Sequence, residues 1–494
     1  MYRYLLLFIL LFMTQPSFAQ CPNRAITLSR QSDIDSFKYL FPNCTEIGTQ
    51  GLSINTIYVK NLDSLSVLTK IYGFLNISSL DSLKSIKGLK NVTEIANLSI
   101  GSNPSLVSLE GLNSLTTAGI INITRNNLLV DLNGLNQLKS CGFLAIGNNQ
   151  RLTSFNGLNS IDSVRTLYIE GNNNVSNFEG MRSLRVSASI SLFDTKIPSL
   201  EGFRNIKTLS SFFLNAARNL KNLTGLNNLA TITNTFDIKY NDSLQNMIGL
   251  ENLTSIGGKV SILYHGKLKN LEGLNQLKSI GSNLTFSSNN NLSMTGLNKL
   301  DSIGGDVDIT SNRFLATLNG MDSLRIISGF LRLISNDSLT SLQGLRYLKN
   351  VKSDIYIYNI PVSNCAIQAV CQKFLTGNSS NLYFSNNRIG CNSKSEVEPS
   401  CRALKTNDVE LPQLSIAPNP SVNHLFLTLK NISSQILTIE IVDLLGKRLF
   451  MDKITPNTEG SLIYPLSVEG WRAGIYIVKI SNSSFYIQQK IIKQ

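Results

Sequence analysis

Pairs of apolar residues separated by one other residue recur along most of the chain at a nearly constant spacing. A glycine followed by a large apolar residue opens each unit, from Gly88-Leu89 to Gly344-Leu345, with 22 to 24 residues between successive glycines. Ten or eleven residues after each glycine comes an apolar-x-apolar triplet, such as Leu98/Ile100 or Ile355/Ile357. This alternation predicts a short strand with one buried face in every unit.

Units of this length cannot bury an apolar face alone, so we expect them to stack around one continuous core. Together with looser units at Ile57/Val59 and Leu75/Ile77, they predict an all-β solenoid of about 14 coils. We expect the glycines to supply turn conformations closed to other residues. Asparagines that follow the triplets should stack and satisfy backbone groups at each bend, namely Asn103, Asn126, Asn148, Asn172, Asn241, Asn289, Asn312 and Asn336.

The N-terminus has the pattern of a signal peptide over residues 1–19. An apolar run of about ten residues, shorter than the roughly 20 that span a membrane, leads to the small-x-small sequence Ser17-Phe18-Ala19. We expect cleavage after Ala19 and export to an oxidising compartment. The cysteines outside the repeats then predict disulfides that staple both ends of the solenoid rather than a zinc site, with three pairings open for the last four: Cys21, Cys44, Cys365, Cys371, Cys391 and Cys401. Cys141, inside a coil, should be buried as a small apolar residue.

These repeats resemble the receptor L-domain, a relative of leucine-rich repeats. The opening Cys44-Thr45-Glu46-Ile47 and Leu52-Ser53-Ile54 are similar to the first coil of that family, and the resemblance covers about residues 21–401. It implies a right-handed β-helix, and we assign the solenoid to residues 20–405. Receptor signalling is not implied, because no kinase or membrane span follows the repeats.

After a linker at residues 406–413, residues 414–494 contain short alternating apolar stretches broken by glycines, which predict a small β-sandwich. The segment resembles the type A C-terminal sorting domain of the type IX secretion system of Bacteroidota. That resemblance implies the secretion machinery as a partner, export, removal of the domain, and release or attachment to the outer-membrane surface. A carbohydrate-binding or immunoglobulin-like module is the alternative. The residues that carry the sorting resemblance are Pro418, Asn419, Pro420, Gly446, Gly474, Tyr476, Lys490 and Lys493.

The residues between the paired apolar positions should point outward from the strands. Most are small or polar, so aromatic and arginine side chains there stand out as contacts for a protein or glycan ligand. They would otherwise cover neighbouring coils or an adjacent domain. The candidates, with neighbours in their coils, are Tyr168, Phe193, Phe213, Tyr264, Arg332, Tyr356 and Tyr358.

Composition limits the chemistry that the chain can perform. Apolar residues make up 42% and charged residues 16%, which favours a folded body over a disordered chain or a multi-span membrane protein. Only His265 and His424 supply imidazoles, and no motif of a metalloprotease, phosphate loop or nucleophile elbow occurs. We therefore expect a non-enzymatic protein without metal or cofactor. The alternatives are a passive surface-layer protein and, less favoured, a glycan-processing enzyme using acids such as Glu110.

The net charge of +13 arises from 45 Lys and Arg against 32 Asp and Glu. Such a charge attracts polyanions. For an exported chain, anionic surface polysaccharide is a more natural counterpart than nucleic acid.

Overall fold

The computed structural model describes residues 21–290, 293–404, 413–430, 432, 436–443, 447–456, 461–482 and 486–494. The predicted signal peptide, most of the predicted linker and Gly446 lie outside the described residues, so the expectations for them stay predictions. The described residues form two apolar cores, one in the repeats and one in the C-terminal segment.

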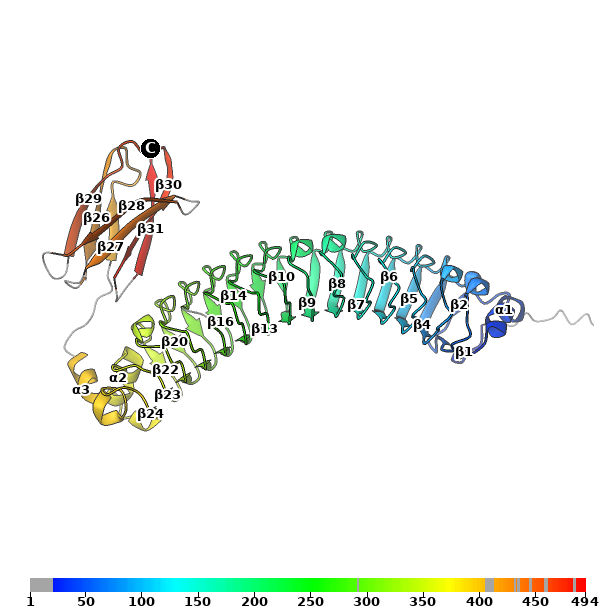
Figure 1. The fold of residues 1–494 in the computed structure, drawn as a ribbon, viewed down its shortest axis with the longest axis horizontal. Helices are drawn as coiled ribbons and strands as arrows, with labels where there is room; N and C mark the ends of the chain where they lie inside the picture. The colour runs from blue at the N-terminus through cyan, green and yellow to red at the C-terminus, as the bar shows by residue number, and fades with distance from the viewer. Residues whose placement is uncertain are drawn as a thin grey trace, which may run out of the picture.

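The repeats form a curved solenoid in which each coil adds one strand to a parallel sheet of 17 strands (Figure 1). Equivalent residues face each other, as in the pairing of Leu98 with Ile121 on the next strand, so the apolar triplets stack into one core. The solenoid prediction is confirmed. Except for β2 (Glu46–Ile47), which pairs with the start of β4, the strands lie in chain order: β1 (Ile26–Leu28), β3 (Leu52–Ile54), β4 (Lys70–Ser78), β5 (Glu94–Gly101), β6 (Thr117–Thr124), β7 (Ser140–Gly147), β8 (Ser163–Glu170), β9 (Val186–Phe193), β11 (Ser211–Asn215), β13 (Phe236–Lys239), β15 (Val260–Leu263), β17 (Leu284–Ser287), β19 (Val307–Thr310), β21 (Leu331–Ile334), β23 (Ile355–Tyr358) and β24 (Leu382–Ser385).

The strand expected at Ile57/Val59 is wrong. Leu52 and Ile54 of β3 pair with Leu75 and Ile77 of β4 and hold that place in the ladder. Residues 57 and 58 form a turn, with Ile57 exposed. Ile57 and Val59 have the spacing of a strand, but the position next to β4 in the sheet is already occupied by the preceding triplet.

A second parallel sheet of seven strands appears only in the later coils. In the early coils the corner residue Ile95 is three positions before Leu98, and one strand runs through both. In most of the later coils the corner residue lies four positions before the triplet, as Ile232 does before Phe236, and the strand is divided into two. This spacing does not decide the division alone, because Leu209 is three positions before Phe212 in a divided coil. The short strands are β10 (Thr208–Leu209), β12 (Thr231–Ile232), β14 (Ser255–Ile256), β16 (Ser279–Ile280), β18 (Ser302–Ile303), β20 (Ile326–Ile327) and β22 (Asn350–Val351).

The marker glycines are required because successive coils approach closely. A Cβ added at Gly225 would overlap the backbone carbonyl of Leu200, and one added at Gly88 would overlap that of Leu62. Gly225 has a φ of +113°, whereas Gly88 lies outside the left-handed range. The expected turn conformation therefore explains Gly225, and the lack of space for a Cβ explains both Gly225 and Gly88.

A buried ladder of polar side chains follows the long strands. The Asn126 side chain donates to the carbonyl of Ile100 (3.0 Å), and the Asn126 backbone N–H donates to Oδ1 of Asn149 (2.9 Å). Each asparagine thus satisfies backbone groups in an apolar interior. The expectation for Asn148 is wrong by one residue, because Asn148 takes a φ of +56° at the exposed bend while Asn149 is fully buried.

Helices and disulfides cover both ends of the solenoid. Helix α1 (Gln31–Leu40) buries Ile34 and Phe37 at the N-terminal end, where Cys21 bonds to Cys44. Helices α2 (Gln368–Leu375) and α3 (Lys394–Leu404) cover the other end. Of the three pairings left open, the structure has Cys365–Cys391 and Cys371–Cys401. Short 3₁₀ turns are η1 (Asp63–Val67), η2 (Lys87–Leu89), η3 (Glu179–Met181), η4 (Glu201–Phe203), η5 (Gln343–Leu345) and η6 (Ser379–Asn381).

The C-terminal segment has two antiparallel sheets around its own core. One contains β25 (Gln413–Ala417), β26 (His424–Lys430) and β29 (Ser461–Ser467). The other has the order β28 (Arg448–Ile454), β27 (Leu437–Asp443), β30 (Gly474–Ser481) and β31 (Tyr486–Lys493). Within the described part of the chain, no helix is both long enough and apolar enough to cross a membrane.

Candidate binding surface of the solenoid

The parallel register turns outward-pointing residues into columns along the sheet. Tyr168 on β8 lies opposite Ser191 on β9, which lies opposite Phe213 on β11. Some outward residues are themselves covered by neighbours in these columns, since Ala145 and Asp237 are each less than a tenth exposed. Large exposed side chains therefore lie beside smaller, mostly polar residues that are partly covered.

Tyr168 and Phe193 form the first aromatic group. Their ring centroids are 5.3 Å apart in a stacked arrangement, and the Tyr168 hydroxyl donates to Oε2 of Glu170 (2.8 Å). Desolvation, followed by this hydrogen bond and the charge of Glu170, raises the pKa of Tyr168 to about 12. Tyr168 is therefore neutral at physiological pH, and its ring offers an uncharged face.

The second group, called here the Tyr356 cluster, consists of Phe330, Arg332, Tyr356, Tyr358 and Tyr383. Arg332, Tyr356 and Tyr383 lie opposite one another on β21, β23 and β24. The rings of Tyr356 and Tyr383 stack at 4.8 Å, and Tyr358 meets Tyr356 edge-on at 6.1 Å. The Arg332 guanidinium lies 4.5 Å from the centre of the Phe330 ring. This group therefore places aromatic faces and a cation together on adjacent strands.

Carboxylates hold the polar ends of this cluster. Arg332 forms an ion pair with Asp308 at 3.0 Å, and the Tyr356 hydroxyl donates to Asp354 at 2.8 Å. The hydrogen bond to Asp354 is the main cause of the raised pKa of Tyr356. Both acids are thus engaged in positioning neighbouring side chains.

Tyr264 lies apart from both groups. It takes a φ of +61° after its strand and stacks on Tyr240 with ring centroids 4.6 Å apart. Both tyrosines are exposed, at 45% and 49%. The column register therefore separates the candidates into three places along the solenoid.

Sequence reasoning missed Tyr240, Phe330 and Tyr383 of these groups, and also Lys394 beside the Tyr356 cluster. Tyr240 follows a marked triplet and was detectable from its matching position one unit before Tyr264. Tyr383 belongs to a strand that no glycine unit announces, and Lys394, 5.8 Å above the Tyr383 ring, comes from the cap helix α3. For both, only the folded cap reveals the proximity. Across the part of the chain that the structure describes, no cluster of His, Cys, Asp and Glu is suited to hold a metal ion.

In the C-terminal sandwich, the Asn419 side chain fastens the segment before β26 to β31. Its Nδ2 donates to the carbonyl of Lys490 (3.0 Å), and its Oδ1 accepts from the N–H of Ile492 (2.9 Å). Asn419 lies between Pro418 and Pro420, whose preceding peptide bonds are both cis. Tyr476 is buried on β30 and donates to the carbonyl of Arg472 (2.7 Å). Gly474 begins β30, and Lys493 ends β31.

Comparison with known proteins gives one family match. Residues 415–494 match the family described as the secretion system C-terminal sorting domain. No curated protein matches the chain. Among solved structures, the chain is similar to a leucine-rich repeat protein from Bacteroides ovatus ATCC 8483, with 17% identity, 70% of this chain and 80% of that chain covered, and a TM-score of 0.17.

The repeat architecture and the sorting domain together define the molecular class. The parallel coils and their leucine-rich units describe the body, and the matched tail gives the destination. The chain is a leucine-rich-repeat-like β-solenoid with a secretion system C-terminal sorting domain, and it is a secreted or outer-membrane-surface protein.

Proposed function

We propose that the solenoid is a non-enzymatic recognition module that binds a protein or glycan through the Tyr356 cluster. The stacked column of Arg332, Tyr356 and Tyr383 carries this proposal. Aromatic rings and arginine provide the largest contact energies at recognition surfaces, since they combine broad apolar faces with directed polar groups. The resemblance of the opening coils to receptor L-domains favours the same role.

A binding role accounts better than catalysis for the acids near the cluster. Asp308 is paired with Arg332, and Asp354 accepts from Tyr356. A general acid or base instead needs a carboxyl group free to exchange a proton with substrate. The competing proposals are a passive surface-layer role, which predicts no saturable ligand, and glycan processing, which predicts turnover.

The test is an array of neutral and acidic glycans and surface proteins, probed with the full chain at two salt concentrations. We expect a saturable, salt-tolerant ligand whose binding falls at least tenfold in Tyr356→Ala/Tyr383→Ala, since buried aromatic contacts each contribute about 1–2 kcal/mol or more. The matched control is Tyr240→Ala/Tyr264→Ala, which removes another stacked tyrosine pair. Equal loss in both variants, or binding that disappears with salt, would contradict a site at the Tyr356 cluster.

A further inference from the structure

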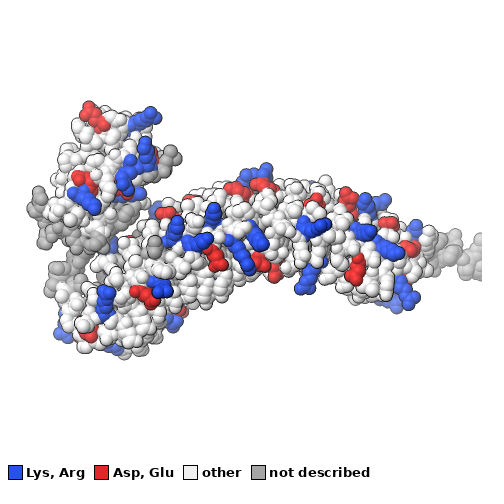
Figure 2. Space-filling view, in the orientation of Figure 1, with Lys and Arg blue, Asp and Glu red and all other residues white. Residues whose placement is uncertain are grey.

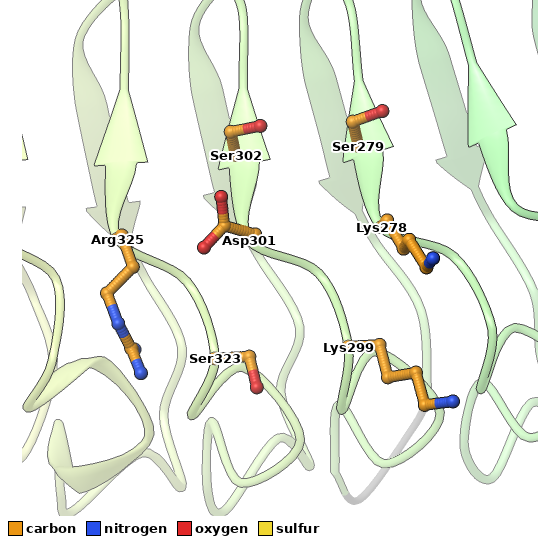
Figure 3. A pocket seen from close by; sticks show the side chains of 7 residues that line it. All are labelled: Lys278, Ser279, Lys299, Asp301, Ser302, Ser323 and Arg325. Atoms are coloured by element: carbon orange, nitrogen blue, oxygen red, sulfur yellow. The ribbon is translucent and has the colours of Figure 1, made fainter.

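A shallow groove lies on the solenoid at the seven-stranded sheet, and none of its lining residues belongs to the Tyr356 cluster. It has a volume of about 540 Å³, and its side chains come from three successive coils (Figure 3). Its cations are Lys278, Lys299 and Arg325, and its one carboxylate is Asp301. On the face of the molecule in Figure 2, basic side chains likewise recur along the solenoid with fewer acids between them.

The backbone register places the charges of the groove in sequence. The Asp301 N–H donates to the carbonyl of Lys278 (2.9 Å), and the Arg325 N–H donates to that of Asp301 (2.8 Å). The column continues with Lys349, whose N–H donates to the carbonyl of Arg325 (2.9 Å). One carboxylate therefore lies between two cations along the solenoid axis, as Figure 3 shows for Lys278, Asp301 and Arg325.

None of the three cations of the groove has an acidic partner within the described ranges. The Lys299 ammonium donates to Oε1 of Gln276 (2.7 Å), and the Arg325 guanidinium donates to the carbonyl of Asp322 (2.9 Å). Arg325 also lies 5.1 Å from the centre of the Tyr347 ring. These contacts orient the side chains without neutralising them, so their charges remain available to an anion.

Serine hydroxyls lie beside the row of charges (Figure 3). Ser279 and Ser302 lie opposite each other on β16 and β18. The Ser323 hydroxyl donates to the carbonyl of Asn298 (2.6 Å), so its oxygen remains an acceptor. The groove therefore offers cations, hydroxyls and one carboxylate in neighbouring rows along the solenoid.

We propose that this groove binds an anionic polysaccharide in which acidic and neutral sugars alternate, lying along the solenoid axis. Lys278, Lys299 and Arg325 would bind carboxylate or sulfate groups, and Asp301 would accept hydrogen bonds from the hydroxyls of the neutral sugar between them. A uniform row of phosphates, as in nucleic acid, would bring like charge against Asp301. This second site does not depend on binding at the Tyr356 cluster.

The test measures binding of the full chain to hyaluronan, whose acidic and neutral sugars alternate, with dextran and double-stranded DNA as comparison ligands at 150 mM salt. We expect saturable binding to hyaluronan and none to dextran. Since a single exposed charge contact contributes little, three are removed together. Lys278→Gln/Lys299→Gln/Arg325→Gln should weaken binding about tenfold.

The matched control is Lys139→Gln/Lys207→Gln/Lys221→Gln, which removes the same charge from exposed lysines outside the groove. We expect less than a twofold change in hyaluronan binding. Asp301→Asn should reduce the preference for hyaluronan over DNA, because it removes the repulsion of phosphate and replaces one of the two acceptor oxygens with a donor. Thermal unfolding of each variant verifies that the fold is retained.

Three outcomes would overturn the proposal. These are no saturable hyaluronan binding, equal weakening in the groove and control variants, and tighter binding of DNA than of hyaluronan by the unaltered chain. The Tyr356→Ala/Tyr383→Ala variant separates the two surfaces, since it should bind hyaluronan normally. Loss of hyaluronan binding there, with the groove variant unaffected, would move the ligand to the Tyr356 cluster and leave the proposed recognition role standing.

Discussion

His265 occupies a place in the buried ladder that asparagine holds in the neighbouring coils. Its Nδ1 accepts the N–H of Asn241 (3.2 Å), and its own N–H donates to Oδ1 of Asn289 (3.1 Å). A proton on Nδ1 would point at the Asn241 N–H, which is itself a donor, and burial disfavours the positive charge of the protonated imidazole. Desolvation accordingly lowers the pKa of His265 to about 4. The imidazole can serve this ladder only while it is neutral.

This lowered pKa predicts a loss of stability in acid. The unfolded chain binds the proton more readily than the folded chain. The contribution of His265 to the free energy of unfolding is therefore complete above about pH 6.5, and it falls by about 1.4 kcal/mol per pH unit as the pH drops towards 4. In the variant His265→Asn the free energy of unfolding should fall less steeply with decreasing pH, while the exposed-site control His424→Asn should keep the full pH dependence. Chemical unfolding measured between pH 7 and 4 checks the difference, and identical slopes for His265→Asn and the unaltered chain would contradict it.

At the scale of elements, the distance between coils depends on the marker glycines. We expect Gly225→Ala to lower the free energy of unfolding by about 2–4 kcal/mol, because the added Cβ meets the Leu200 backbone at a positive φ. Gly48→Ala is the matched control, since a Cβ there has nothing within 4 Å. Denaturant unfolding of the two variants provides the measurement. A Gly225→Ala protein as stable as the control would show that the coils can separate at little cost.

The sequence predicted these elements wherever a feature was periodic. The triplets gave the strands of the large sheet, since burial on one face requires alternation. The short second sheet was missed because the extra residue between Ile232 and Phe236 is only a partial signal, since Leu209 and Phe212 lack it in a coil that is also divided. The Asn148 error has a similar origin, because two adjacent asparagines fit the pattern and only the bend decides which one turns inward. Contacts that depend on the cap, such as those of Tyr383 and Lys394, have no periodic signal.

For the whole molecule, the sorting domain is expected to act independently of the solenoid, since each has its own apolar core. A chain truncated after Leu411 should fold its repeats yet fail to reach the outside of the cell. Residues 413–494 appended to a periplasmic reporter should bring that reporter to the surface or the medium. Protease accessibility on intact cells and assay of the culture medium measure both. Surface display of the truncated chain would refute the sorting role.

The pairing of each coil with its neighbours also has a mechanical meaning. Tension along the solenoid axis pulls directly on the hydrogen bonds between adjacent strands, so coils should detach one after another from a free end rather than all at once. Each detached coil of about 23 residues releases up to roughly 80 Å of slack. The disulfides Cys21–Cys44 and Cys371–Cys401 close loops at the two ends where peeling would begin. A ligand bound to the solenoid at the cell surface would therefore be held by a body that lengthens under tension and whose two ends are reinforced by disulfides.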